Sequence, residues 1–238
     1  MLILGVVMYY RFSATSRQEI IQGTQKLMEQ AGENMEDYLM SMRQISDAAY
    51  YNVIKESDFS GHEIEIQRGM SLLYEANRDK LRSIAVYNNY GSLMGAEPVA
   101  AQKEDPDVTR QDWYKQAMSE MENMHFSTPH IQNLFDDSTF RYYWVISLSR
   151  AVELTDRGAP QLGVLLVDMD YSSISRMMAQ INARNNGQYY YLCDSNGKII
   201  YHTRQMFRKP QSRTASYTIL RKDNLFSIEN QEILFTMS

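Results

Sequence analysis

The sequence predicts an α+β protein in which a long N-terminal helix precedes two tandem modules with antiparallel sheets. Apolar residues recur at helical spacing between positions 28 and 49, and after position 80 the spacing changes to the alternation that is typical of strands. A strand–turn–strand pattern occurs twice, and its turn glycines, Gly91 and Gly197, lie 106 residues apart, a plausible module length. Because only 41 residues follow Gly197, the second module is predicted to be smaller or truncated.

Length and composition narrow the classes of protein. The chain has 238 residues, a net charge of −5 and 44% hydrophobic residues, which suffice for one large core or two small ones. An acidic balance without a block of five Lys or Arg residues excludes nucleic acid as a partner. The single cysteine, Cys193, excludes an intramolecular disulfide and a thiolate metal site. We interpret Cys193 as a small buried hydrophobe.

The first twelve residues are apolar and end at a charge. Residues 2–10 are too few to cross a bilayer, and no basic stretch precedes them as in a signal peptide. Two tyrosines followed by Arg11 are typical of the interfacial end of a membrane helix. We therefore expect residues 1–12 to be the end of a truncated transmembrane helix, with a buried apolar N-terminus as the alternative.

Residues 13–56 are predicted to form a long signalling helix. Residues 16–19, Ser-Arg-Gln-Glu, fit a capping box if the helix starts there; otherwise it continues the preceding segment. A seven-residue repeat gives this helix one apolar face. Met and Ala pack weakly across such a face, so we expect the helix to lie along a domain and to meet a partner helix in a homodimer. A helix packed only in the core of its own chain is the alternative. The repeat consists of Met28, Ala31, Met35, Tyr38, Met42, Ile45 and Ala49.

The elements of the first module follow a break at residues 58–61. The predicted elements are a helix at 63–77, a hairpin with strands 81–87 and 92–94, a helix opened by residues 105–107 that carries Trp113, Ala117 and Met121, strands at 142–148 and 162–168 joined through a turn at 156–160, and a helix at 172–182.

The second module repeats the hairpin and then loses clear signals. Strands are predicted at 189–193 and 198–201 around a turn at 194–197, and another strand pair at 225–237 around Glu229 and Asn230. The segment 204–216 between them is basic and polar. We expect the remaining sheet of this module to be incomplete.

The sequence contains no motif that indicates catalysis. Glycine spacing excludes a GxGxxG dinucleotide fingerprint and a phosphate-binding loop. His125 and His130 are five residues apart, a spacing that does not place both on one helix face, so we interpret the histidines as structural. No serine lies in a Gly-x-Ser-x-Gly elbow. We therefore expect no enzyme activity, no cofactor and no metal site in this chain.

Aromatic residues mixed with a few charges indicate a binding site instead. Strand alternation places Val164, Leu166 and Asp168 on one face, and a carboxylate that continues an apolar face must be solvated, paired or turned toward a ligand. Asp168 is therefore interpreted either as a ligand anchor or as the partner of Arg150 in an ion pair. Aromatic walls with one or two fixed charges are typical of pockets for small polar ligands. The candidate residues are Tyr87, Trp113, Tyr114, Tyr142, Trp144, Arg150 and Asp168.

Five segments in order resemble the landmarks of double Cache (dCache) sensor domains. They are residues 107–117, 125–130, 145–150, 163–168 and 190–202. The chain is most similar to the extracytoplasmic domains of Gram-positive sensor histidine kinases, of the kind often linked to carbohydrate uptake. The resemblance implies PAS-like modules: a membrane-distal Cache module at 57–183, an incomplete membrane-proximal module at 184–238, and a long helix shared by both.

The resemblance also implies a function and a ligand site. It maps Trp113, Tyr114 and Asp168 onto pocket positions, but Gln111 stands where the amino-acid-binding subset has an arginine for the ligand carboxylate. That departure disfavours an α-amino acid; the expected ligands are an amine, an amino acid, a sugar, another small metabolite or a sugar-loaded binding protein.

The expected function is ligand sensing outside the plasma membrane for a two-component histidine kinase whose kinase portion lies outside this sequence. Three alternatives stay open: a chemoreceptor sensor domain, a soluble solute-binding protein and a purely structural interaction domain.

Overall fold

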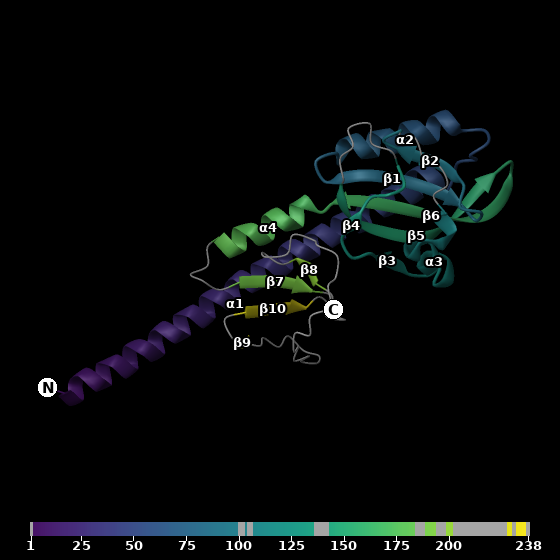
Figure 1. Ribbon diagram of the computed structural model, residues 1–238. Coiled ribbons are helices and arrows are strands. Elements are labelled where there is room, and N and C mark those ends of the chain that lie inside the picture. Colours follow the sequence, from purple (N-terminus) through teal and green to yellow (C-terminus); the bar gives the residue numbers. More distant parts are fainter. Residues whose placement is uncertain are drawn as a thin grey trace. The chain divides into compact units, whose positions relative to one another are not determined.

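A computed structural model describes residues 2–99, 103, 107–135, 143–183, 189–193, 199–201, 228–229 and 232–236. Helices and sheets both occur, which confirms the predicted α+β class (Figure 1). The chain divides into two compact units, one formed by Met1–Asp37 with Arg176–Ser238 and the other by Tyr38–Ser175.

The N-terminal helix α1 (Leu2–Ala49) runs without a break at Ser16 and ends in a π-helical turn, Tyr50–Ile54. No helix among the described residues is both long enough and apolar enough to cross a membrane. Six of the seven repeat positions are buried within the single chain, and Tyr38 is half-buried. The apolar face that these positions form, which we call the stripe, is therefore covered within its own chain, as predicted by the alternative of a helix packed in the core. The six buried positions are Met28, Ala31, Met35, Met42, Ile45 and Ala49.

The unit Tyr38–Ser175 is built on one antiparallel sheet. Its strand order is β2-β1-β6-β5-β3, and β4 also pairs with β5. The elements are α2 (Glu63–Ala76), β1 (Leu81–Asn88), β2 (Leu93–Glu97), a 3-10 turn (Val108–Arg110), α3 (Asp112–Ser119), β3 (Met124–Phe126), β4 (His130–Ile131), β5 (Trp144–Asp156) and β6 (Ala159–Asp170).

Helices cover the two faces of this sheet. Helix α2 lies beside β2 and β1, whereas α3 lies beside β5 and β3 (Figure 1). On the face that we call the α3 face, Ala85, Tyr87, Val164 and Leu166 form one buried cluster with Trp113 and other residues of α3. Strand alternation directs the intervening residues to the opposite face, where α1 and α2 pack.

At two positions of this unit the backbone requires glycine. Gly91, in the β1–β2 turn, has a φ of +79°, which favours glycine. A Cβ on Gly163 would lie 2.4 Å from the Tyr87 carbonyl oxygen, so a side chain there would force β6 away from β1. Gly163 thus permits the close strand contact that places Asp168 further along β6 beside β1.

A predicted helix and a predicted pair of strands differ from the observed elements. The helix predicted to open at residues 105–107 begins only at Asp112, because Gln111 is extended (ψ 140°) and separates it from the 3-10 turn; Met121 lies beyond its end and is 51% exposed. The strands predicted at 142–148 and 162–168 form a longer hairpin, β5–β6. Its tight turn, Arg157-Gly158, has positive φ at both residues, and the Asp58 carboxylate accepts hydrogen bonds from both backbone N–H groups.

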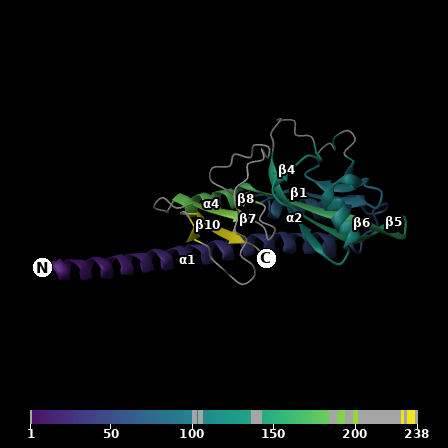
Figure 2. The same ribbon diagram turned by 60° about the horizontal axis from the view of Figure 1, so that its bottom comes forward.

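The second unit contains a smaller sheet, as predicted. It holds most of α4 (Ser172–Ala183) and the sheet β8-β7-β10-β9, formed by β7 (Tyr189–Cys193), β8 (Ile199–Tyr201), β9 (Ile228–Glu229) and β10 (Glu232–Thr236) (Figure 2). Strand β10 runs parallel to β7, so this sheet is mixed and not wholly antiparallel. Cys193 is buried, as expected. The predicted turn at 194–197 and the basic segment 204–216 lie outside the described residues.

Candidate ligand-binding site

The site centres on Asp168, which lies between two serines on neighbouring strands. The sheet register places Ser83 of β1 and Ser147 of β5 directly opposite Asp168 of β6. Ser83 Oγ donates to Asp168 Oδ2 at 2.8 Å, and Ser147 Oγ donates to Asp168 Oδ1. Only 1% of Asp168 is exposed. Burial raises the pKa of Asp168, and the hydrogen bonds from Ser147 and Ser83 and the charge of His130 oppose that rise.

His130 of β4 lies next to Ser147. Its Nε2 is 3.4 Å from Ser147 Oγ, and its Nδ1 is 3.0 Å from the Thr128 carbonyl oxygen and 3.2 Å from Ser127 Oγ. Ser127 accepts a hydrogen bond from the Ser147 backbone N–H at 2.9 Å. These contacts hold the β3–β4 connection, and His130 with it, against the strand that carries Ser147.

Three aromatic residues form a wall on the same face. The rings of Tyr87 and Trp113 lie 5.6 Å apart, and those of Trp113 and Tyr114 lie 5.8 Å apart, edge to face. Ser149 Oγ donates to the Trp113 carbonyl oxygen at 3.0 Å, which ties α3 to β5. Tyr114 Oη donates to the Asn88 carbonyl oxygen at 2.8 Å, which ties the same helix to the end of β1.

The Tyr87 hydroxyl is the polar group of this wall that remains unsatisfied. Tyr87 is fully buried, and its oxygen has no hydrogen-bond partner among the described residues. Burial raises the pKa of Tyr87, and the negative charge of Asp168 raises it further, so the phenol is neutral. A buried hydroxyl without a partner is costly, and a polar ligand that bonds to it would remove that cost.

The structure brings together four of the predicted site residues. Tyr87, Trp113, Tyr114 and Asp168 share the α3 face. Tyr142 lies outside the described residues.

The other two predicted residues lie elsewhere. Strand alternation places Trp144 and Arg150 on the opposite face of β5 from Ser147. Arg150 Nη1 donates to Asp47 Oδ1 of α1 at 2.6 Å, so the predicted alternative of an Asp168–Arg150 ion pair is wrong. The reason is register: position 150 is an even number of residues from 144 and an odd number from 147.

Ser83, Ser147 and His130 were not predicted as site residues. The two serines interrupt apolar strands at inward positions, which is the one signal that a single sequence offers for them. Their relation to Asp168 depends on strand pairing between segments that are far apart in the sequence.

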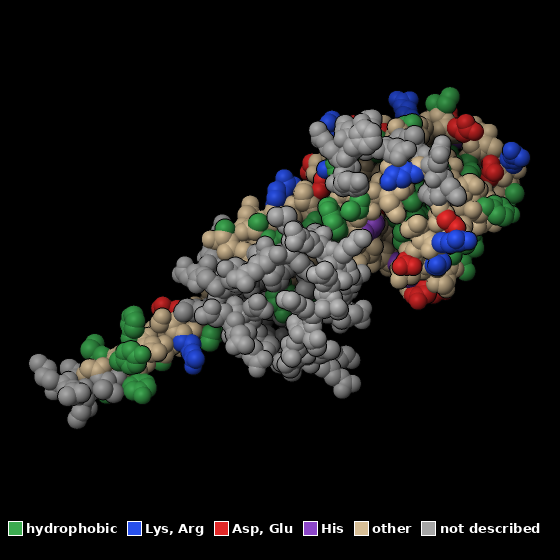
Figure 3. Space-filling view, in the orientation of Figure 1, with side chains coloured by type: hydrophobic (Ala, Val, Ile, Leu, Met, Phe, Trp, Pro, Cys, Tyr) green, Lys and Arg blue, Asp and Glu red, His purple; other side chains and the backbone are tan. Residues whose placement is uncertain are grey.

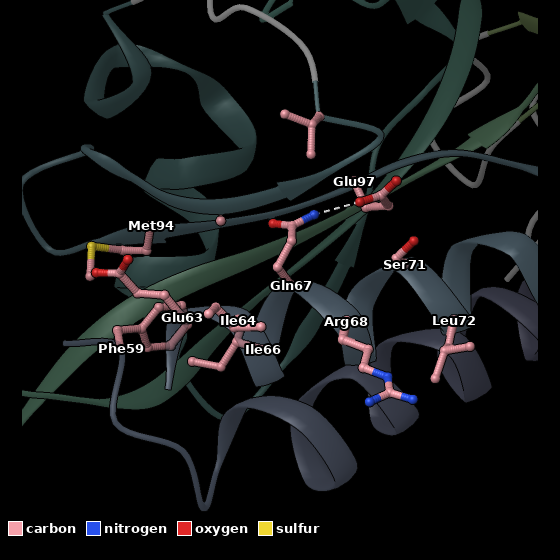
Figure 4. A pocket seen from close by; sticks show the side chains of 12 residues that line it. Phe59, Glu63, Ile64, Ile66, Gln67, Arg68, Ser71, Leu72, Met94 and Glu97 are labelled. Atoms are coloured by element: carbon pink, nitrogen blue, oxygen red, sulfur yellow. Dashed lines mark hydrogen bonds between the residues drawn. The ribbon is translucent and has the colours of Figure 1, made fainter. Parts of the chain in front are cut away.

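A separate groove lies between α2 and β2, away from Asp168. Its volume is about 790 Å³, and its lining includes Phe59, Ile64, Gln67, Leu72, Met94 and Glu97. Figure 4 shows Gln67 reaching from α2 to Glu97 on β2, where its Nε2 donates at 2.5 Å. The groove is open and its lining mixes apolar residues with charged ones such as Glu63, Arg68 and Glu97, whereas the Asp168 cluster combines a buried charge with an unsatisfied hydroxyl. We therefore take the Asp168 cluster as the candidate ligand site.

The described residues contain no group of three or more His, Cys, Asp or Glu side chains that could hold a metal ion.

A family model of the Cache domain, in its double form (dCache), matches residues 12–233. The chain belongs to the Cache domain family. No curated protein sequence matches this Cache domain.

Solved structures show the same fold at low sequence identity. The ligand-binding domain of the Pseudomonas aeruginosa PAO1 amino acid chemoreceptor PctC, in complex with GABA, is 18% identical with a TM-score of 0.56, over 75% of this chain and 74% of that one. The ligand-binding domain of the Pseudomonas fluorescens chemoreceptor CtaA, in complex with L-serine, is 17% identical with a TM-score of 0.58, over 79% and 74%. That of the Campylobacter jejuni chemoreceptor Tlp3, in complex with L-norvaline, is 16% identical with a TM-score of 0.57, over 82% and 74%.

In this Cache domain, Gln111 stands where the resemblance to the amino-acid-binding subset implies an arginine for the ligand carboxylate. Gln111 precedes α3 and brings no charge to the site. Neighbouring Arg110 has a side chain that is 82% exposed, and it pairs with Asp107 at 2.8 Å. Neither residue therefore supplies a buried cation for a ligand carboxylate.

Proposed function

We propose that this Cache chain is the extracytoplasmic sensor region of a membrane-bound two-component histidine kinase, and that it binds a small organic amine at Asp168. Membership of the Cache family supports the sensor role. The motif resemblance to Gram-positive sensor kinases favours a kinase output. The related structures named above come from chemoreceptors, so a chemoreceptor is the second candidate.

The observation that carries the ligand class is the environment of Asp168. Its carboxylate is 1% exposed, and its hydrogen bonds come from two neutral serine hydroxyls. Within the described part of the chain, no Lys or Arg forms an ion pair with it. A buried carboxylate without a strong counter-charge is costly, and a ligand cation would supply that charge. The rings of Tyr87 and Trp113 would exclude water and present π-faces to the cation.

Position 111 favours an amine over an α-amino acid. An amino acid needs a donor for its carboxylate as well as an acceptor for its ammonium group. This site offers the acceptor, Asp168, whereas Gln111 stands in place of the expected arginine. The neutral Tyr87 hydroxyl is available to a further polar group of the ligand.

Attachment to a membrane and pairing with a second copy belong to the same proposal. The first turns of α1 expose large apolar side chains, with Met8, Tyr9, Tyr10 and Phe12 between 68% and 76% exposed. Hydrophobic side chains gather along this part of α1 (Figure 3). Such a surface suits a bilayer interface or a partner helix better than water.

A thermal-shift screen of amines, α-amino acids and sugars, followed by calorimetry, tests the proposal. Asp168→Asn should weaken amine binding by about 10- to 150-fold, the equivalent of the 1.5–3 kcal/mol of a charge-assisted hydrogen bond. Glu153→Gln, which removes an exposed carboxylate elsewhere on β5, should leave the affinity unchanged. Equal affinities for Asp168→Asn and wild type, or binding of neutral sugars alone, would contradict the ligand class.

The output module requires a different test. Reading the gene beyond both ends of this sequence should reveal a second membrane helix followed by a histidine kinase core. A downstream chemoreceptor signalling region would favour the second candidate. The absence of both a membrane helix and a signalling region would favour a soluble solute-binding protein.

A further inference from the structure

A line of hydrogen-bonding groups crosses three strands, from Asp168 on β6 through Ser147 on β5 to His130 on β4. Ser147 Oγ contacts both Asp168 Oδ1 and, at 3.4 Å, His130 Nε2. At the far end His130 Nδ1 lies 3.0 Å from the Thr128 carbonyl oxygen. Asp168 and Ser147 are each 1% exposed, and His130 is half-buried at the sheet edge, so the line leads from a closed interior toward the surface.

Counting protons along this line shows that one additional proton would let every contact in it be a hydrogen bond. His130 Nδ1 faces the Thr128 carbonyl, which only accepts, and at 3.2 Å the Ser127 hydroxyl, which can also accept, so we place a hydrogen on Nδ1. If Asp168 is ionised and His130 neutral, Asp168 Oδ1 and His130 Nε2 both face the single hydroxyl proton of Ser147, which can be donated to only one of them. One additional proton satisfies every group in two ways. Either His130 Nε2–H donates to Ser147 and Ser147 donates to Asp168, or protonated Asp168 donates to Ser147 and Ser147 donates to His130 Nε2.

The other groups around Asp168 do not supply this proton. Ser83 on β1 is a neutral donor, and Asp170 on β6 is paired with Arg82. Tyr87 on β1 and Tyr38 on α1 both feel the charge of Asp168, and their pKa values are raised, so both phenols are neutral. Burial raises the pKa of Asp168, whereas the hydrogen bonds from the two serines and, with a smaller effect, the charge of His130 lower it.

We propose that Asp168, Ser147 and His130 hold one proton in common, and that a cation entering beside Asp168 releases it. The release of the proton by a ligand cation rests on the proposed function. When the cation binds, Asp168 stays an anion and pairs with it, His130 becomes neutral, and its proton passes to solvent, so the charge of the site is unchanged. Because cation and proton compete, affinity for a monovalent amine rises with pH, by up to about tenfold per unit, for as long as the shared proton is bound.

NMR on the ligand-free protein tests the shared proton without any ligand. In the wild type, the Asp168 carboxyl carbon should shift in two steps as pH is changed, one of them at the pH where the His130 ring titrates. Ser147→Ala should remove that step, whereas Ser83→Ala, which deletes the other hydroxyl bonded to Asp168, should keep it. His130→Gln should also remove it, which covers the case that Ser147→Ala does not fold. No common step in the wild type, or equal effects of the two serine variants, would overturn the proposal.

Calorimetry with propylamine, in buffers of different ionisation enthalpy between pH 6 and 8, tests the release. Up to one proton should leave per amine bound to wild type, and Ser83→Ala should behave in the same way. Ser147→Ala should release distinctly less. Binding of propylamine to wild type without proton release would overturn the exchange. Failure of wild type to bind any amine, with the common NMR step present, would contradict the proposed ligand class and leave the shared proton supported.

Discussion

At the scale of single residues, burial of Asp168 lowers stability at the position that we propose as a ligand site. Its carboxylate is buried among apolar strands, and burial raises its pKa. A raised pKa in an acid means that the folded protein resists ionisation more than the unfolded chain does. The residue therefore lowers the stability of the empty protein at neutral pH, as is common for residues kept for function.

Asp168→Asn should be more stable than wild type at pH 7. Since the folded pKa lies above the unfolded value of about 3.9, the contribution of Asp168 is fully present below pH ~4 and is lost as pH rises through the folded pKa. The melting temperature of the variant should thus exceed that of wild type at neutral pH, and the difference should shrink as pH falls toward 4. Asp47→Asn should show the opposite sign at pH 7. A variant less stable than wild type at pH 7 would show that the hydroxyls and His130 outweigh burial.

At the scale of elements, β5 connects two surfaces with different partners. On one face Ser147 and Ser149 contact Asp168 and Trp113, and on the other Arg150 contacts α1. The Arg150 guanidinium pairs with Asp47 and lies 5.1 Å from the Tyr50 ring, in the π-helical turn that ends α1. A shift of β5 on ligand binding would therefore reach the end of α1 directly. The proposed signal would have a physical route here, since one strand contacts both the Asp168 cluster and the end of α1.

Arg150→Gln should loosen the attachment of α1 to the sheet. The side chain is 14% exposed and combines an ion pair with ring contacts, so its loss should cost about 1.5–3 kcal/mol in urea denaturation. Arg43 provides a matched control, because it also faces Asp47, at 3.9 Å, but is 60% exposed. Arg43→Gln should cost less than about 0.5 kcal/mol. Equal costs for the two variants would show that Arg150 does not anchor the helix.

At the scale of the whole molecule, the apolar stripe of α1 is used inside one chain. Its buried positions occur both before and after residue 38, so both units contain a part of the buried face. A homodimer formed through this stripe would first have to expose it. Association through the exposed side chains at the start of α1 carries no such cost.

Thiol chemistry distinguishes these two arrangements. In a Cys193→Ser background, Met28→Cys and Met35→Cys should react with a thiol reagent at least roughly 100-fold more slowly than Met40→Cys, because reaction of a buried thiol requires local opening. Met28 and Met35 are each 4% exposed, whereas Met40 is 44% exposed. Rapid disulfide crosslinking between two chains at Met28 and Met35 would contradict the buried stripe and restore it as a dimer face.

The sequence by itself determined most of the elements and named the residues of the proposed site. The helices at 63–77 and 172–182, the two hairpins and the final strand pair occur close to their predicted positions. Periodicity and turn residues are local properties, and a single sequence displays them directly. The same local logic singled out Tyr87, Trp113, Tyr114 and Asp168, which share one face, as well as Trp144 and Arg150, which lie on the other; that the first four bind a ligand stays a prediction.

Only the tertiary structure decided what surrounds Asp168. Its hydrogen-bond donors lie 85 and 21 positions away, at Ser83 and Ser147, and strand register brings them to one row. Register also turned Arg150 to the opposite face, toward Asp47, 103 positions away. A shift of one residue would exchange the two faces of β5 and with them every partner. The sequence specifies which residues are present, but their pairing depends on contacts between distant segments, and no local sequence pattern shows those contacts.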